Sequence, residues 1–189
     1  IEFLREDSFN IFNESTEGIH KVKKIVENLK EVSRIDNAKD WEESDIHKGL
    51  DSTLNIAANE IKYRANVIKD DGTLPLVYCK LSEINQVFLN LIINACQAFN
   101  NDALGTITIK TWHDTDDKKV YIMISDNGCG IPEENLKKIF DPFFTTKPIG
   151  VGTGLGLSIS YGIIQKHKGS LRVESDIGKG TTFLISLPL

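Results

Sequence analysis

The chain has 189 residues, enough for one ordinary domain or for one domain with a helical appendage. With 40% hydrophobic and 26% charged residues it has the composition of a globular protein, which argues against global disorder. The net charge of −5 disfavours non-specific binding to a phosphate backbone, so we expect no nucleic-acid partner, although a few local donors suffice to bind a small anion.

Cysteine usage and apolar runs exclude two further classes of protein. Cys79, Cys96 and Cys129 form no CxxC pair, so they indicate neither a disulfide framework nor a zinc site, and they suit a reducing cytosol. The longest apolar stretch, residues 87–94, is interrupted by asparagine and predicts no membrane span. The chain lacks a starting Met and a signal-peptide layout, and it opens on an amphipathic stretch, so we expect it to be a piece of a longer protein.

The first part of the chain has a helical pattern. Apolar residues recur at helical spacing across residues 19–32, with Lys and Glu on the other faces. Such a long helix has no core of its own to cover, so the pattern predicts one helix of a hairpin or coiled coil; a surface helix of the following domain is the alternative. Residues 36–45 are acidic and polar and indicate a linker. We therefore expect a helical unit with its linker over residues 1–45 and a second domain over residues 46–189.

In the second domain, helical and strand patterns alternate. Helices are predicted over residues 46–59, over residues 82–99 with Ser82 as N-cap, after Pro132, and over residues 156–166. Strands are predicted over residues 63–67, 76–78, 106–112, 119–125, 170–175 and 181–187. Mixed helices and mostly antiparallel strands predict an α+β fold, one sheet covered by helices.

Two polar clusters stand out because their residue types lower the stability of a fold and so call for a further reason. Asn90 and Asn94 lie one turn apart on one face of an otherwise apolar helix. Buried amides need partners, so this pair either caps neighbouring backbone or faces a ligand. Asp126 follows a strand directly, with Gly128 and Gly130 behind it. This is either an ordinary loop or a tight turn that lets a flat ligand approach the backbone.

Two further segments indicate an anion site. The aromatic run over residues 140–147 is either packing or a hinged lid whose Lys147 reaches an anion. The loop over residues 150–158 has four glycines in seven residues and precedes an apolar helix. Such a loop offers bare N–H groups and the positive end of the helix dipole to phosphates. Its spacing fits neither the dinucleotide fingerprint nor a Walker A loop.

The order of these segments is far more specific than any one of them. The asparagine helix, DNGCGIP, FDPFFTTK, GVGTGLGLS and the final GKGTTF resemble, over residues 46–189, the ATP-binding catalytic domain of sensor histidine kinases. The resemblance implies the two-layer α/β sandwich shared with gyrase, Hsp90 and MutL, the Bergerat-type ATP-binding fold: a mixed sheet, helices on one face and a mobile ATP lid.

The resemblance also assigns roles to residues. Asp126 is expected to accept a hydrogen bond from the adenine amino group, Gly128 and Gly130 to let the backbone approach the base, and Thr181 to contact adenine through water. Asn94 is expected to coordinate Mg²⁺, with Asn90 beside it near the phosphates; a neutral amide suffices because Mg²⁺ keeps phosphates and waters as its other ligands. The residues expected to hold the β- and γ-phosphates are Lys147, Gly152, Thr153, Gly154, Leu155, Gly156 and Leu157.

The implied activity is transfer of the γ-phosphate of ATP to a His on a dimerisation helix, for relay to an Asp of a response regulator. The resemblance implies a cytoplasmic catalytic domain, a homodimeric full-length protein and a parent that is membrane-anchored in some family members. The alternatives are an ATP hydrolase of the same fold and a non-catalytic nucleotide sensor. Hydrolases usually have a Glu general base where Asn90 stands, and Asn cannot take up a proton at neutral pH. A degenerate sensor is expected to have lost Asn94, Asp126 or a lid glycine, and all are present.

None of the four histidines fits the phosphoacceptor, which in the family precedes an acidic residue and has a Pro a few residues on. They are His20, His47, His113 and His167. We therefore expect residues 1–45 to contain the second helix of the dimerisation hairpin, the first helix and its His to be absent, and this chain to be unable to phosphorylate itself.

Overall fold

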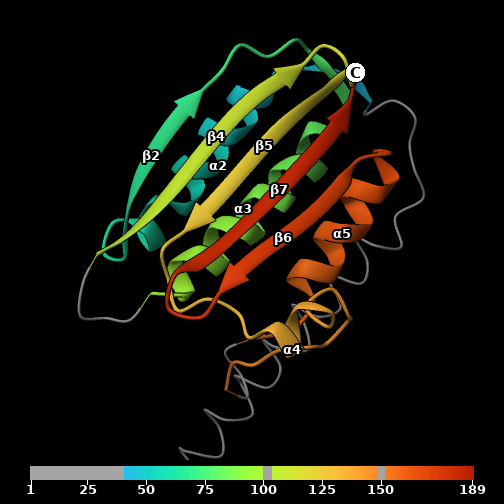
Figure 1. The fold of residues 1–189 in the computed structure, drawn as a ribbon. Helices are drawn as coiled ribbons and strands as arrows, with labels where there is room; N and C mark the ends of the chain where they lie inside the picture. The colour runs from blue at the N-terminus through green and yellow to red at the C-terminus, as the bar shows by residue number, and fades with distance from the viewer. Residues whose placement is uncertain (1–40, 100–103, 149–151) are drawn as a thin grey trace, which may run out of the picture.

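The computed structural model describes residues 41–99, 104–148 and 152–189, which form two layers (Figure 1). Helices α2 (Ile46–Ile61), α3 (Leu81–Gln97) and α5 (Gly156–Lys166) cover one face of a five-stranded sheet. The short helix α4 (Glu133–Leu136) lies at one end of the sandwich. The predicted α+β sandwich, one sheet with helices on one face, is confirmed.

The sheet mixes parallel and antiparallel pairs. In spatial order its strands are β2 (Ala65–Asp71), β4 (Gly105–Asp114), β5 (Lys119–Asp126), β7 (Gly180–Pro188) and β6 (Ser170–Asp176). Strands β2 and β4 run parallel, and the other three neighbouring pairs are antiparallel. The register of β5 and β7 sets Asp126 opposite Thr181. Two residues expected at the same ligand, 55 positions apart in the chain, are thereby brought together by strand pairing alone.

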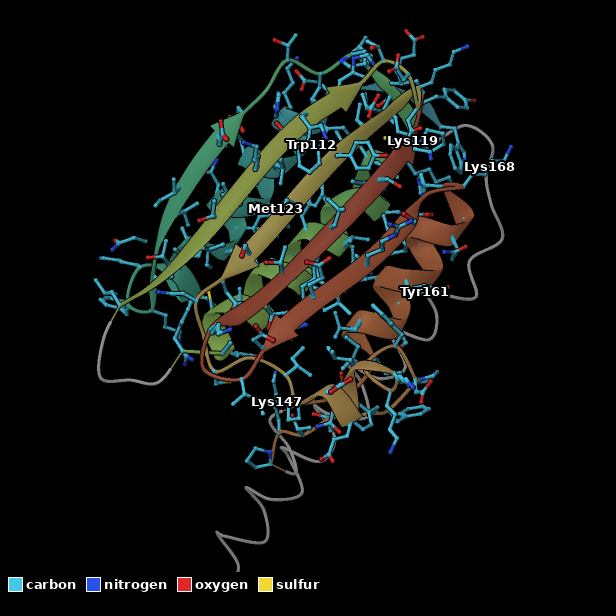
Figure 2. All side chains as sticks on the ribbon, in the orientation of Figure 1. Trp112, Lys119, Met123, Lys147, Tyr161 and Lys168 are labelled. Carbon is cyan, nitrogen blue, oxygen red and sulfur yellow. The ribbon has the colours of Figure 1, made fainter. Side chains whose placement is uncertain are left out.

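Strands β4 and β5 show the two-residue alternation expected of a sheet with one covered face. Ile109 on β4 and Ile122 on β5 are fully buried under the helices. Trp112 and Met123 stand on the face that the helices leave open, as Figure 2 shows. Because burial is one-sided, the sequence pattern fixes which face of these strands meets the helices.

Helix α3 contributes most of the helical side of the core. Its buried residues recur at helical spacing and include Ile84, Phe88, Leu91, Ile92 and Ala95. Helix α2 packs beside it, and begins where the carboxylate of Asp45 accepts hydrogen bonds from the backbone N–H groups of His47 and Lys48.

Three local predictions are wrong. The linker expected over residues 36–45 does not extend to its end: Glu42–Ser44 form strand β1, antiparallel to β3 (Val77–Cys79), and Asp45 caps α2. Such short strands pair across more than thirty residues and leave no local pattern. Tyr63 lies in a turn before β2, not in a strand. Ser82 is not an N-cap, because α3 begins at Leu81 with Lys80 in the capping position. The helix predicted over residues 19–32 lies outside the described residues.

The start of α3 is anchored by a side chain far away in the sequence. The backbone N–H of Lys80 donates to Nε2 of His167 (3.1 Å), and Nδ1 of His167 lies 2.8 Å from the carbonyl oxygen of Ile163 in α5. These partners define a neutral imidazole with its proton on Nδ1. The ring is buried, and the indole of Trp41 packs against it at a centroid distance of 4.5 Å, with the two ring planes tilted by 31°. His167 therefore ties the beginning of α3 to the end of α5.

We expect His167→Ala to lower the free energy of unfolding by about 3 kcal/mol, because it leaves a cavity under Trp41 and the backbone N–H of Lys80 without its imidazole acceptor. Urea denaturation followed by circular dichroism measures this loss. His113→Ala, at the partly exposed end of β4, is the matched control and is expected to cost less than about 1 kcal/mol. Equal losses in the two variants would show that His167 is not an anchor.

Candidate active site

A cleft of about 820 Å³ opens between α3, the segment after β5, the residues around Lys147 and the start of α5. Eleven of the thirteen residues assigned from the sequence line it: Asn90, Asn94, Asp126, Gly130, Lys147, Gly152, Thr153, Gly154, Gly156, Leu157 and Thr181. Gly128 and Leu155 do not line it. Leu155 is buried at the N-cap position of α5. The fold thus gathers residues of α3, the end of β5, the segment from Lys147 to the start of α5, and β7 around one cavity.

One end of the cleft is built around the carboxylate of Asp126, which is 9% exposed at the end of β5. Its Oδ1 accepts hydrogen bonds from the backbone N–H groups of Gly128 (2.8 Å) and Thr181 (3.3 Å). Within the described part of the chain Oδ2 has no hydrogen-bond partner, so it remains free to accept from a ligand. Burial raises the pKa of the Asp126 carboxyl above its ordinary value of 3.8, and the two backbone hydrogen bonds oppose this rise.

The glycines after Asp126 serve the packing of the protein itself. A Cβ on Gly128 would lie 2.6 Å from Cβ of Ala98 at the end of α3. Gly130 has a φ of +74°, and its Cβ would lie 2.1 Å from the carbonyl oxygen of Asp176, the last residue of β6. The sequence predicted that these glycines make room for a base. The structure gives a nearer reason, since both allow this turn to fit between α3 and the β6–β7 turn.

The part of the cleft around Lys147 holds three polar side chains. Nζ of Lys147 donates to Oδ1 of Asn94 (3.1 Å) and also to Oε1 of Gln97. Burial lowers the pKa of the Lys147 ammonium. Figure 2 shows Lys147 at the end of the molecule where α4 lies. Gln97 was missed from the sequence, although it follows Asn94 by three residues and so lies on the same face of the helix.

Asn90 joins α3 to the beginning of α5. Its Nδ2 donates to the carbonyl oxygen of Gly156 (3.1 Å) and to Oγ of Ser160 (3.2 Å). Of the two alternatives for the asparagine pair, backbone capping describes Asn90, whereas Asn94 faces the cleft and a cation. The Asn90 contact fixes the first turn of α5, whose N-terminal amide groups point toward the cleft end where the glycine-rich loop arrives.

A metal ion beside Asn94 could draw few ligands from the protein. Among the described residues, no group of three or more His, Cys, Asp or Glu side chains could hold a metal ion. The amide oxygen of Asn94 nevertheless already holds a cation, the ammonium of Lys147. One neutral oxygen suits Mg²⁺, which usually takes one or two protein ligands and completes its shell with phosphates and waters.

The comparison with known families identifies this sandwich as an ATPase domain. Residues 79–189 match the family described as histidine kinase-, DNA gyrase B- and HSP90-like ATPase, and the chain belongs to this family.

Its relatives are sensor histidine kinases. The chain is 39% identical over 173 residues to the signal transduction histidine-protein kinase AtoS of Escherichia coli (strain K12), a match that covers 90% of this chain and 28% of AtoS. It is 40% identical over 138 residues to sporulation kinase E of Bacillus subtilis (strain 168), covering 72% of this chain and 18% of that kinase. The chain therefore spans less than a third of either relative.

Solved structures of histidine kinases have the same fold. The nucleotide-free catalytic domain of histidine kinase ThkA aligns with a TM-score of 0.69 and 31% identity, covering 78% of this chain and 95% of that domain. The mycobacterial sensor histidine kinase MprB aligns with a TM-score of 0.66 and 26% identity, covering 78% of this chain and 97% of that one. No helix among the described residues is both long and apolar enough to cross a membrane.

Asp126→Asn tests the aspartate end of the cleft. The variant keeps an oxygen for the Gly128 and Thr181 N–H groups but replaces the free carboxylate oxygen with an amide donor. We expect ATP affinity to fall by about 1.5 kcal/mol or more, since a charge-assisted acceptor is lost, with little loss of folding stability. Calorimetric titrations of both proteins with ATP and GTP measure this. Equal binding of ATP and GTP by the unmutated chain would contradict the role of Asp126.

Proposed function

We propose that this chain is the catalytic part of a two-component sensor histidine kinase, which transfers the γ-phosphate of Mg²⁺–ATP to a histidine on a dimerisation helix. The observation that carries this proposal is that one cleft gathers an acceptor carboxylate, an amide oxygen, a lysine and a helix N-terminus. These groups fit a ligand that has both a hydrogen-bond donor and an anionic part.

The aspartate end suits adenine. The free Oδ2 of Asp126 can only accept while the carboxyl is ionised, and adenine offers an amino donor where guanine has a carbonyl. Thr181, held beside it by strand pairing, has its hydroxyl 2.9 Å from Oγ of Ser175 and is 4% exposed. So small an opening agrees with a contact to the base through water.

The part of the cleft around Asn94 and Lys147 suits the phosphates. Asn94 would ligate Mg²⁺, which when bound bridges and neutralises the β- and γ-phosphate oxygens. Lys147 and the backbone amides at the start of α5 would hold the phosphate oxygens, since both present positive charge to the cleft. Phosphoryl transfer depends mostly on such positioning and charge neutralisation.

Asn90 favours a kinase over a hydrolase. A hydrolase of this fold needs a general base near the position of Asn90, and an amide cannot serve as one. Both donor contacts of Asn90 also go to acceptors, the carbonyl of Gly156 and the hydroxyl of Ser160, which in turn donates to the same carbonyl (2.8 Å). A carboxylate in this place would face the Gly156 carbonyl oxygen without a proton to share. The position is therefore built for an amide donor that fixes α5.

The acceptor histidine is proposed to lie on another helix. Among the described residues, His167 is buried between α3 and α5. His47, in the first turn of α2, hydrogen-bonds to Thr111 (2.8 Å). His113 lies near the end of β4. None of the three lines the cleft. We propose that the parent protein is a homodimer, with its catalytic domain in the cytoplasm, that phosphorylates itself and passes the phosphoryl group to a response regulator.

Asn94→Ala is expected to weaken Mg²⁺–ATP binding about tenfold while leaving adenosine binding nearly intact, because the amide oxygen lies at the metal end. Calorimetric titration with Mg²⁺–ATP and with adenosine separates the two effects. Equal loss of both ligands would mean that Asn94 holds the helix together and does not meet the metal.

We expect the 189-residue chain to bind ATP without labelling itself from γ-labelled ATP, since no histidine in it lies in an acidic-flanked context on a dimerisation helix; His113, which precedes Asp114, lies at the end of a strand. Adding a complete dimerisation hairpin is expected to yield an acid-labile, base-stable phosphate, the signature of a phosphoramidate. Autoradiography after acid and base treatment measures this. Labelling of the chain alone that disappears in His20→Gln would contradict the assignment of residues 1–45.

A further inference from the structure

Two amide oxygens on one face of α3 converge on a single ammonium group. Asn94 and Gln97 are three residues apart, and Lys147 donates to both carbonyl oxygens from a distant segment of the chain. We call these two oxygens the amide pair. Both are uncharged, so the pair attracts a cation through its dipoles without binding any particular ion tightly. The ammonium is the cation that occupies it in the structure.

The occupant and the proposed metal need the same atom. A Mg²⁺ ion would lie about 2.1 Å from Oδ1 of Asn94. The Lys147 nitrogen lies 3.1 Å from that oxygen, so the two cations could be no more than about 5 Å apart. Their repulsion, in a partly buried position, opposes simultaneous occupancy. Mg²⁺ also keeps a near-octahedral shell of waters and phosphate oxygens, which requires the space that the ammonium fills.

We propose that Lys147 is the resident cation of the amide pair when no nucleotide is bound, that Mg²⁺ must displace it, and that Gln97 is the positioning residue that holds the ammonium there. This inference rests on the proposed function of the cleft. Lys147 then has two positions. In the absence of metal it stays at the amide pair, both without nucleotide and with ATP bound, and there its charge offsets that of the phosphates in place of Mg²⁺. Once Mg²⁺ is bound, Lys147 is free of the pair. The metal requirement of nucleotide binding is set by this competition.

Gln97 makes the inference testable, because replacing it leaves the charge of Lys147 and the oxygen of Asn94 in place. Gln97 is exposed, so Gln97→Met is expected to fold normally. The measured quantity is the ratio of the ATP dissociation constant in EDTA to that in saturating Mg²⁺, by calorimetry. The ratio is expected to rise about threefold or more in Gln97→Met, since the ammonium loses one of its two acceptors and competes less well.

A double-mutant cycle identifies the route of the effect. Lys147→Met is expected to raise the ratio further, and the Gln97→Met/Lys147→Met double variant to equal Lys147→Met alone, because Gln97 acts only through the ammonium. Gln165→Met makes the same chemical change on an exposed part of α5 that does not line the cleft, and is expected to leave the ratio unchanged.

Results that overturn this inference can be told apart from results that overturn the proposed function. An unchanged ratio in Gln97→Met overturns the inference, and so does a lower one, which would assign Gln97 to the shell of the metal itself. Additive effects in the double variant overturn it as well. If the unmutated chain binds no ATP, or binds it equally well with and without Mg²⁺, the proposed function fails and the inference falls with it. ATP binding with normal metal dependence but no effect of Gln97→Met removes the inference alone.

Discussion

The structure depends on the two duties of helix α3. One face of this helix must be apolar enough to form the core against the sheet, with Phe88 and Ile92 fully buried. The neighbouring face must carry amides, because Asn90 fixes the start of α5 and Asn94 meets the cation. The apolar residues and the amide residues lie on neighbouring faces of the same turns of the helix. The candidate site therefore lies directly beside the core. The candidate site residues on this helix are therefore positioned by the packing of the core.

Much of this was predictable from the sequence because it depends on local pattern. The alternation along residues 106–112 and 119–125 predicted two half-buried strands, and the ordered motifs predicted which segments would line one cleft. The unpredicted features are set by tertiary pairing. Strand β1 needs a partner more than thirty residues away, and the start of α3 is anchored by His167 where the sequence suggested Ser82. The contact of Gln97 with Lys147 crosses fifty positions, and the three-residue spacing from Asn94 was its one local sign.

The candidate site is held at a cost in stability. Because burial raises the folded-state pKa of the Asp126 carboxyl, its protonated form favours the fold: that contribution is complete below pH 3.8 and is lost as pH rises through the folded-state pKa. The ionised form of this carboxyl is a buried charge, which two backbone N–H groups offset only in part. Such a carboxylate is tolerated where it serves a ligand, and a stability-driven redesign of this chain would be expected to replace it first.

The pairing of β5 with β7 has a consequence for folding. Strands β4 and β5 form one hairpin and β6 and β7 form another, each from residues close together in the chain, and Asp126 meets Thr181 only when these hairpins dock. The aspartate end of the cleft is therefore absent from every state in which they are apart. A ligand bound there selects the completely paired sheet and stabilises it by mass action, at long range in the sequence. Nucleotide in the cell would in this way act as a folding chaperone for its own binding domain.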